Sequence, residues 1–366
     1  MPLVAIFVVA IAFIPSALFP IQAMGEPPLG TFSIVARDSV TGELGVAVQS
    51  RAFSVGMAVP WAEAEIGAVA TQASTNESFG PRGLAFLRAG LDAGETLVHL
   101  LAHDSEREHR QLAVVDAGGG TAAHTGSSCL DWAGHHTGRG YSCQGNILAG
   151  AAVVEAMARA YETTAGELAR RLLAALAAAQ AAGGDRRGQQ SAALLVVRPS
   201  ERYPEYRTRY VDLRVEDHPE PISELTRVYE MHEAGDLVRA HLRFAEEYAA
   251  AGDSALAARE RDQVGRTLER VLARGTKDAN LLNGLAWFTA LANVYLDQAL
   301  EAAKRAVDLE PKNFEILDTL AEVHFRRGEM ADAVSVAERA LALDPKSTYL
   351  KDQVARFRAA MRDRPK

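Results

Sequence analysis

Polar side chains able to recognise amides or carboxylates lie at the ends of the strands expected in the first part of the chain. Arginine and glutamine suit this role, because guanidinium and amide groups form paired hydrogen bonds with planar partners. The candidate binding residues at strand ends are Thr71, Gln72, Asn76, Arg110, Gln111, Gln144 and Asn146, and a later loop adds Asp185, Arg187 and Gln190. Taken alone, each is more typical of a surface or turn position, so a shared cleft is a hypothesis.

Other kinds of site are disfavoured by residue type and spacing. His99 and His103 are four residues apart but lack the internal glutamate of a zinc protease, and no CxxC pair is present, so neither a metal nor a cofactor is expected. A phosphate-binding loop needs a lysine, and no lysine precedes Lys277. The formal net charge of −8 disfavours nucleic acid as a partner, since phosphate binding needs a basic face.

The elements that must position these side chains alternate between short strands and helix pairs. Residues 31–37 and 44–49 alternate in polarity around a turn and predict a hairpin. The further expected strands are 56–61, 66–72, 111–115, 121–124, 191–197 and 206–215. The expected helices are one that opens at Pro81, then 94–102, 151–161 and 168–182. This order predicts an α+β domain.

The remainder of the chain is expected to be helical and repetitive. Pro219 and Pro221 mark a linker, and Leu-Glu-Pro-Lys at 309–312 recurs as Leu-Asp-Pro-Lys at 343–346. This shift of 34 residues is the tetratricopeptide period. The region 222–366 therefore predicts an all-α solenoid of tetratricopeptide type. Its clearest repeats are 279–312 and 314–346.

The extreme N-terminus is nearly all apolar over residues 1–23. Such a run predicts a secretory signal or a membrane anchor, and Pro15 and Pro20 favour the signal because they interrupt a spanning helix. Small residues follow at 23–25, although no Lys or Arg precedes the apolar core. We expect residues 1–25 to direct export to the periplasm or the medium. The alternative is anchoring by an uncleaved segment, the only route by which a membrane is expected to be involved.

The two cysteines of the chain, Cys129 and Cys143, lie close together in the sequence. In an exported protein they are candidates for a disulfide. Two free buried thiols are an equally weighted alternative.

Residues 31–217 resemble domain-of-unknown-function family 1028, which is placed in the N-terminal-nucleophile hydrolase superfamily. The resemblance is carried by 31–38, 42–50, 70–73, 110–111, 131–134, 144–146 and 183–192. It implies a four-layer αββα sandwich. It also favours a binding pocket for a small amide or carboxylate, because the candidate polar residues concentrate in the matching segments.

The superfamily's chemistry implies that Thr31 is the nucleophile. A threonine at the first position of a chain has an α-amine of pKa about 7.7–8, which serves as the base for its own hydroxyl. Thr31 opens the first strand and follows Gly30, but residues 26–30 would still precede it after a cut behind Gly25. A second cut is therefore required. Without the resemblance, Thr31 is more simply a β-branched residue at the start of a strand, and Ser33 is a weaker substitute nucleophile.

The run Gln49-Ser50-Arg51 stands where proteasome-like enzymes carry an Asp-Ser-Arg-like run. Gln49 departs from that pattern, since an amide cannot hold a charged partner, and is assigned to the binding set. Arg51 is expected to supply positive charge in the catalytic site, because no lysine is available there. The proteasome version of the site is therefore absent, and a penicillin-acylase-like site and a non-catalytic site remain as alternatives.

Two functions follow from these observations, beside a lesser third in which the repeats are the functional half and the first domain is a structural platform. The first is an exported hydrolase-like protein that cuts a small amide or peptide-like bond with Thr31, while the repeats dock a protein or peptide in their groove. The second is a non-catalytic ligand-binding domain on the same fold, joined to an interaction scaffold. Homo-oligomerisation is left open by the sequence.

Overall fold

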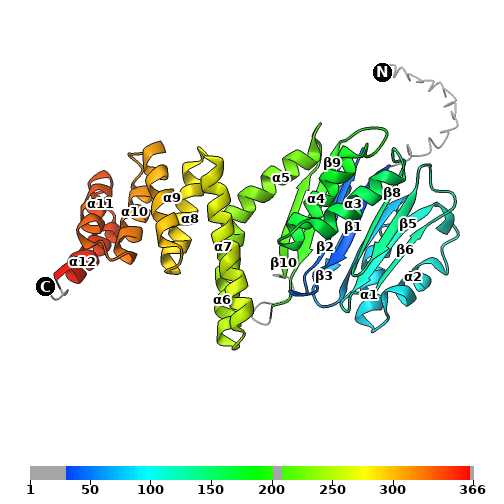
Figure 1. Cartoon of the computed structure of the whole chain (residues 1–366), viewed down its shortest axis with the longest axis horizontal. Coiled ribbons are helices and arrows are strands. Elements are labelled where there is room, and N and C mark those ends of the chain that lie inside the picture. Colours follow the sequence, from blue (N-terminus) through cyan, green and yellow to red (C-terminus); the bar gives the residue numbers. More distant parts are fainter. Residues whose placement is uncertain (1–29, 201–207, 363–366) are drawn as a thin grey trace, which may run out of the picture.

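A computed structural model describes residues 30–200 and 208–362. Ten strands, in two antiparallel sheets, form the first part of the chain (Figure 1). The six-stranded sheet has the order β10-β9-β2-β1-β8-β7 and the four-stranded sheet the order β3-β4-β5-β6. The strands are β1 Thr31–Arg37, β2 Leu44–Ser50, β3 Pro60–Glu63, β4 Gly67–Ala73, β5 Arg110–Asp116, β6 Thr121–Thr125, β7 Gly134–Gly138, β8 Tyr141–Asn146, β9 Ser191–Val197 and β10 Arg209–Val215.

Two helix pairs cover the outer faces of the sheets, so the expected αββα layering is confirmed (Figure 1). The first pair, α1 Phe79–Arg88 and α2 Ala93–Leu101, packs on the four-stranded sheet. The second pair, α3 Ala151–Thr163 and α4 Leu168–Ala181, packs on the six-stranded sheet. The two sheets enclose a separate apolar core between them.

The alternation of β1 explains this layering. Phe32, Ile34 and Ala36 join the core beneath α3 and α4, whereas Val35 joins the core between the sheets. Because successive side chains of a strand point to opposite faces, Thr31 and Ser33 also face the opposing sheet. Polar groups thus lie between the sheets at one end and apolar groups at the other.

Helices form the rest of the described chain. They are α5 Pro221–His232, a π-helical turn Glu233–Leu237, α6 Val238–Ala250, α7 Ser254–Arg274, α8 Ala279–Leu291, α9 Leu296–Leu309, α10 Phe314–Arg326, α11 Met330–Leu343 and α12 Thr348–Arg362. The pairs α8–α9 and α10–α11 correspond to the two clearest expected repeats, and their small alanines are buried at the helix contacts. No helix among the described residues is long and apolar enough to cross a membrane.

The first domain and the helices meet through a buried polar network. Arg198, just after β9, pairs with Glu43 (Nη1–Oε1 3.1 Å) and with Glu260 of α7 (Nη2–Oε1 2.6 Å). His241 of α6 lies between Glu167, the residue before α4 (2.8 Å), and the same Glu260 (2.7 Å). This network fixes α6 and α7 against the first domain.

The fold differs from expectation at two places, and two expected segments lie wholly or partly outside the described residues. The expected strand at 56–61 is a 3₁₀ turn, Val55–Met57, followed by β3, because the first residues of this run curl away before pairing begins. The hairpin β7–β8 was not expected from the sequence. The apolar segment 1–23 lies outside the described residues, as does part of the strand expected at 206–215.

Candidate functional site

Five strands meet at the end of the sandwich where the expected polar residues lie. Thr31, which opens β1, is the cross-strand partner of Ser50 at the end of β2 and of Asn146 at the end of β8. In the other sheet, Ala73 at the end of β4 pairs with Arg110 at the start of β5. Antiparallel pairing therefore places the start of one strand beside the end of the next, which explains how distant segments meet here.

A layer of amides and hydroxyls fills the space between the sheets at this end. Ser33 Oγ donates to Gln72 Oε1 (2.6 Å) and accepts from Gln144 Nε2 (2.7 Å). Gln111 Oε1 accepts from Gln72 Nε2 (2.8 Å) and from Asn146 Nδ2 (3.0 Å). Five of the expected polar residues are thus bound to one another, and they hold the two sheets in register.

Thr31 is held in a second group of contacts beside this layer. Its side chain is only 2% exposed, and Thr31 Oγ1 donates to Ser50 Oγ at 3.0 Å. The carbonyl oxygen of Gly30 accepts two hydrogen bonds, from Ser50 Oγ at 2.6 Å and from Arg187 Nη2 at 2.8 Å. Two donors, one of them cationic, therefore polarise the carbonyl of the peptide bond that precedes Thr31.

Asp185 positions this arginine. Its buried carboxylate pairs with Arg187 Nη2 at 2.7 Å and accepts from the backbone N–H of Arg51 at 3.2 Å. A Cβ atom on Gly30 would lie 2.7 Å from Asp185 Oδ2 and 2.9 Å from Arg187 Nη2. Only glycine fits at position 30 without displacing the pair, so the residue before Thr31 is dictated by this contact.

A cavity of about 1020 Å³ opens at the same end of the sandwich. Asn76, Arg110 and Asn146 are the expected binding residues that line it. Three large apolar side chains on its wall are exposed to solvent: Phe53 (69%), Met57 (67%) and Leu130 (49%). The cavity therefore offers polar groups from the strand ends together with an apolar rim, as small-molecule sites commonly do.

Backbone strain concentrates around the same cavity. Ser54, Ala73 and Ile147 line it, and all three have positive φ angles, of 57°, 69° and 55°. This conformation is unfavourable for any side chain, and for a β-branched isoleucine it is an outlier. They make up half of the non-glycine residues with positive φ in the described ranges. Strain of this kind persists only where the surrounding structure holds it in place, and three such positions meet at the wall of this one cavity.

Some expected site residues lie elsewhere. Gln49 is the cross-strand partner of Phe32 and so faces α3 and α4, away from the space between the sheets. Thr71 faces α1 and α2 by the same alternation and donates to the carbonyl of Asn76. Neither side chain joins the polar layer, because the one-residue alternation of a strand turns it to the outer face.

Two more expected residues lie at the rim. The exposed side chain of Arg51 donates to the carbonyl oxygen of Gln189 at 3.3 Å, and only its backbone joins the group around Gly30. Gln190 Nε2 donates to Asp217 Oδ1 at 3.1 Å on the exposed surface. The positive charge near Thr31 comes from Arg187 rather than from Arg51.

Arg110 is occupied by an ion pair at the cavity edge. Its Nε donates to Asp104 Oδ2 at 2.8 Å, and its Nη1 donates to the carbonyl oxygen of Ser74 at 2.6 Å. The hydrogen bond from Arg110 lowers the pKa of Asp104. The charge of Arg110 at the cavity is therefore balanced by the carboxylate of Asp104.

The two cysteines are free thiols, so the disulfide is not formed in this structure. Cys143 is buried on the side of β8 that faces α3 and α4, and burial raises its pKa well above the ordinary value. Cys129 lines the cavity and donates to the carbonyl oxygen of Arg110 at 3.3 Å.

Sequence reasoning missed Ser50 as a member of the site and missed the apolar rim. Ser50 had a usable signal, because alternation from Val46 and Val48 places it on the inner face with Thr31. The rim residues come from irregular segments whose spacing carries no period, so no local pattern identifies them.

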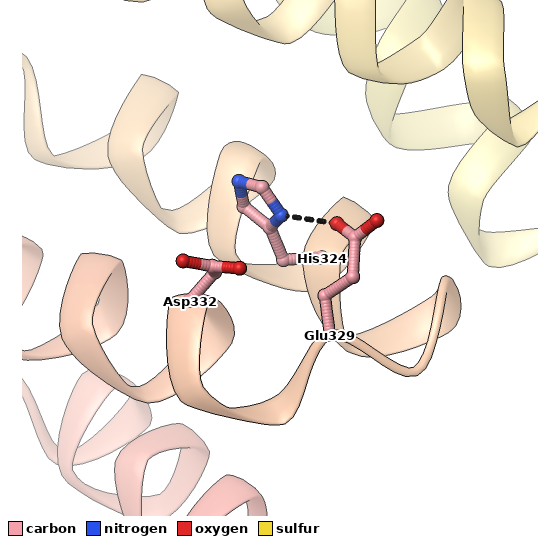
Figure 2. A group of neighbouring side chains, drawn as sticks. All are labelled: His324, Glu329 and Asp332. Atoms are coloured by element: carbon pink, nitrogen blue, oxygen red, sulfur yellow. Dashed lines mark hydrogen bonds and ion pairs between the residues drawn. The ribbon is translucent and has the colours of Figure 1, made fainter.

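One further cluster lies among the repeats. Figure 2 shows His324 and Glu329 pointing toward one another, with Asp332 beside them. His324 Nδ1 and Glu329 Oε2 are 2.6 Å apart, and the three potential ligand atoms lie within 4.8 Å of one another. Arg327 Nε already donates to Glu329 Oε1 at 2.9 Å. A metal ion would have to compete with this guanidinium. We therefore infer that the cluster stabilises the turn between α10 and α11.

The first domain also matches known proteins. The Family of unknown function (DUF1028) matches residues 31–225, just over half of the chain. The chain belongs to this family. A crystal structure of DUF1028 protein SPO2555 from Silicibacter pomeroyi is 37% identical, with a TM-score of 0.52, and the match covers 57% of this chain and 88% of that one. No curated protein matches the chain.

The helical part of this DUF1028 chain matches a tetratricopeptide repeat family over residues 290–357. Solved structures aligned to the chain include the tetratricopeptide domain of Sgt2 from Aspergillus fumigatus, 16% identical with a TM-score of 0.25, covering 32% of this chain and 80% of that one. Another is the first such domain of human RPAP3, 15% identical with a TM-score of 0.25, covering 36% and 94%. The assignment of tetratricopeptide repeats rests on the match to the repeat family over residues 290–357.

Proposed function

We propose that the first domain cleaves amide bonds with Thr31 as its nucleophile, and that its first substrate is its own Gly30–Thr31 bond. The observation that carries this proposal is the doubly hydrogen-bonded carbonyl of Gly30, next to the hydroxyl of Thr31. Donors aimed at a carbonyl oxygen stabilise the negative charge that develops there during acyl transfer. Ser50 and Arg187 are the two donors.

The cut follows from this arrangement. Thr31 Oγ1 adds to the carbonyl carbon of Gly30, the C–N bond breaks, and the hydroxyl proton passes to the nitrogen of Thr31. Water then hydrolyses the resulting ester, which releases the carboxylate of Gly30 and restores the hydroxyl. The products are a peptide ending at Gly30 and a chain that begins at Thr31 with a free α-amine, the base required for later turnovers.

The external substrate is a small amide or peptide-like molecule in the strand-end cavity. Asn146 lines this cavity and is the cross-strand partner of Thr31. The proposed nucleophile on β1 is therefore next to a strand, β8, that contacts the substrate. Asn76 and Asn146 supply hydrogen-bonding groups, and the apolar rim supplies contact area. We further propose that the protein is exported through its apolar N-terminus and that the repeats dock a protein partner.

The test is the mass of the mature chain. Full-length protein and a Thr31→Ala variant are purified, and their N-termini and intact masses are followed over time at several protein concentrations. We expect the wild type to begin at Thr31, at a rate independent of concentration, and Thr31→Ala to keep Gly30. Thr31→Ser is expected to retain the cut because it keeps the hydroxyl.

A second function is supported by the same geometry in the uncut chain. Thr31 is buried, and its preceding carbonyl is firmly held, as suits a permanent structural contact. If the wild type keeps Gly30, the catalytic proposal is wrong, and the domain is a ligand-binding module that uses the cavity. Cell fractionation tests export separately, since protein found only in the cytoplasm would contradict it.

A further inference from the structure

The helices α8, α10 and α12, which follow one another along the C-terminal part of the chain (Figure 1), share a hollow of about 320 Å³. Its lining comes from all three helices: Trp287, Leu291, Glu322, Tyr349, Asp352, Gln353 and Arg356. Leu291 and Tyr349 are exposed. Stacked helical repeats bind partners on surfaces that run across several repeats, and this hollow spans three helices, so we take it as the docking groove.

Two carboxylates of α10 lie at this hollow, one helical turn apart: Glu322 lines it, and Asp318 contacts its lining residues Tyr349 and Gln353. Glu322 is buried and neutralised on both sides, by Arg326 (2.8 Å) and by Arg356 of α12. Asp318 accepts only from neutral donors, the hydroxyl of Tyr349 at 3.4 Å and the amide of Gln353. Within the described ranges, no cationic group forms an ion pair with it.

Because Asp318 is half-buried, the lack of an ion-pair partner affects its charge state. Burial raises the pKa of Asp318 to about 6 and the charge of Glu322 adds to this effect, against the hydrogen bonds from Gln353 and Tyr349 and the charge of Arg356, which lower it. A carboxylate in this state gains from a cation brought close to it, because a nearby positive charge favours the ionised form. Asp352, exposed on the wall of the hollow, adds a second acidic group.

We propose that the groove formed by α8, α10 and α12 binds a peptide segment that places a lysine or arginine side chain against Asp318 and Asp352. The aliphatic stem of that side chain lies against Tyr349 and Trp287, and an adjacent apolar residue contacts Leu291. Aromatic faces next to carboxylates suit a cationic side chain, since the ring attracts the charge as well. This inference rests on the proposed docking role of the repeats and is independent of the chemistry at Thr31.

The test uses defined peptide mixtures. Acetylated and amidated seven-residue peptides carry a fixed central Lys, Arg, Glu or Leu, flanked by equal mixtures of Ala, Leu, Ser and Tyr. Binding of each mixture to the full chain is measured by competition against a fluorescent Lys-centred mixture. The variants are Asp318→Asn, which keeps an oxygen for Tyr349 and Gln353, and the matched control Asp308→Asn on the exposed face of α9.

We expect the Lys and Arg mixtures to bind about fivefold more tightly than the Glu and Leu mixtures, as a partly exposed ion pair allows. Asp308→Asn should keep this preference and Asp318→Asn should lose it, with Asp352→Asn reducing it. A preference for Glu or Leu, or an unchanged preference in Asp318→Asn, would overturn the inference while leaving docking intact. If none of the mixtures binds, the docking role itself is wrong.

Discussion

At the scale of single residues, the site is organised around the peptide bond between Gly30 and Thr31. Ser50 Oγ contacts both sides of this bond, since it donates to the carbonyl oxygen of Gly30 and accepts from the hydroxyl of Thr31. Arg187 supplies the second donor, and Asp185 fixes its guanidinium. The missing side chain at Gly30 is what allows these groups to approach so closely.

The first prediction concerns these two donors. Ser50→Ala and Arg187→Gln should each slow the appearance of a chain that begins at Thr31, by about 100-fold, because each removes one hydrogen bond to the developing oxyanion. The matched control is Arg186→Gln, the neighbouring arginine, whose side chain bonds the carbonyl of Asp131 on the exposed surface. Time courses of intact mass measure the rates.

Cutting at the wild-type rate in both donor variants would show that the carbonyl contacts are structural. Arg187→Gln also leaves Asp185 without its cation, so thermal melting of each variant is recorded beside the kinetics. Ser50→Ala removes no charge. It therefore separates a loss of catalysis from a loss of folding.

At the scale of elements, the layer between the sheets is tied together by one residue. Gln111 of β5 accepts from β4 and β8 through Gln72 and Asn146. Its Nε2 donates to Thr125 Oγ1 of β6 and to the carbonyl oxygen of Gly145, both at 2.9 Å. Strands β4, β6 and β8 thus all depend on the same buried amide.

The second prediction follows from that dependence. Gln111→Ala should lower the free energy of unfolding by about 2–4 kcal/mol, because several buried donors and acceptors lose their partner at once. Gln190→Ala, which removes an exposed amide bonded to Asp217, should change it by less than about 0.5 kcal/mol. Urea titrations of both variants check this. Equal effects would mean that water replaces the buried contacts of Gln111.

The elements also show what the sequence could and could not predict. Strands with alternating apolar residues and the 34-residue repeat were predictable, because both are local periods. The hairpin β7–β8 was missed because β7 is Gly-His-His-Thr-Gly, which has no apolar alternation. The faces of Gln49 and Thr71 were also missed, although alternation along their strands carried that information. The cavity could not be predicted, since its wall is assembled by tertiary contacts.

At the scale of the whole molecule, buried charges join the first domain to the helices α6 and α7. Arg198 and His241 share the carboxylate of Glu260, and each has a second carboxylate from the first domain, Glu43 or Glu167. Burial of such groups is favourable only when each charge keeps its partners. The stability of this junction therefore depends on the protonation of the network.

The last prediction concerns His241, whose two ring nitrogens each face a carboxylate. Burial disfavours its charge, but Glu167 and Glu260 outweigh that effect and raise the pKa of His241 from 6.5 to about 9. A raised pKa contributes stability that is complete below pH 6.5 and is lost as the pH rises through 9. At about 1.4 kcal/mol per pH unit, the contribution is at most about 3–4 kcal/mol.

Urea titrations between pH 6 and 10 measure this contribution, with His241→Gln as the comparison. Burial also raises the pKa of Glu43, to about 7, so both proteins lose some stability between pH 4.5 and 7 for a reason unrelated to the histidine. The difference between wild type and His241→Gln isolates the imidazolium. We expect that difference to shrink as the pH rises from 6.5 to 9, because the wild type loses its charge there. A difference that stays constant across this range would mean that His241 is neutral in the folded chain, and that Arg198 alone balances the carboxylates at the junction.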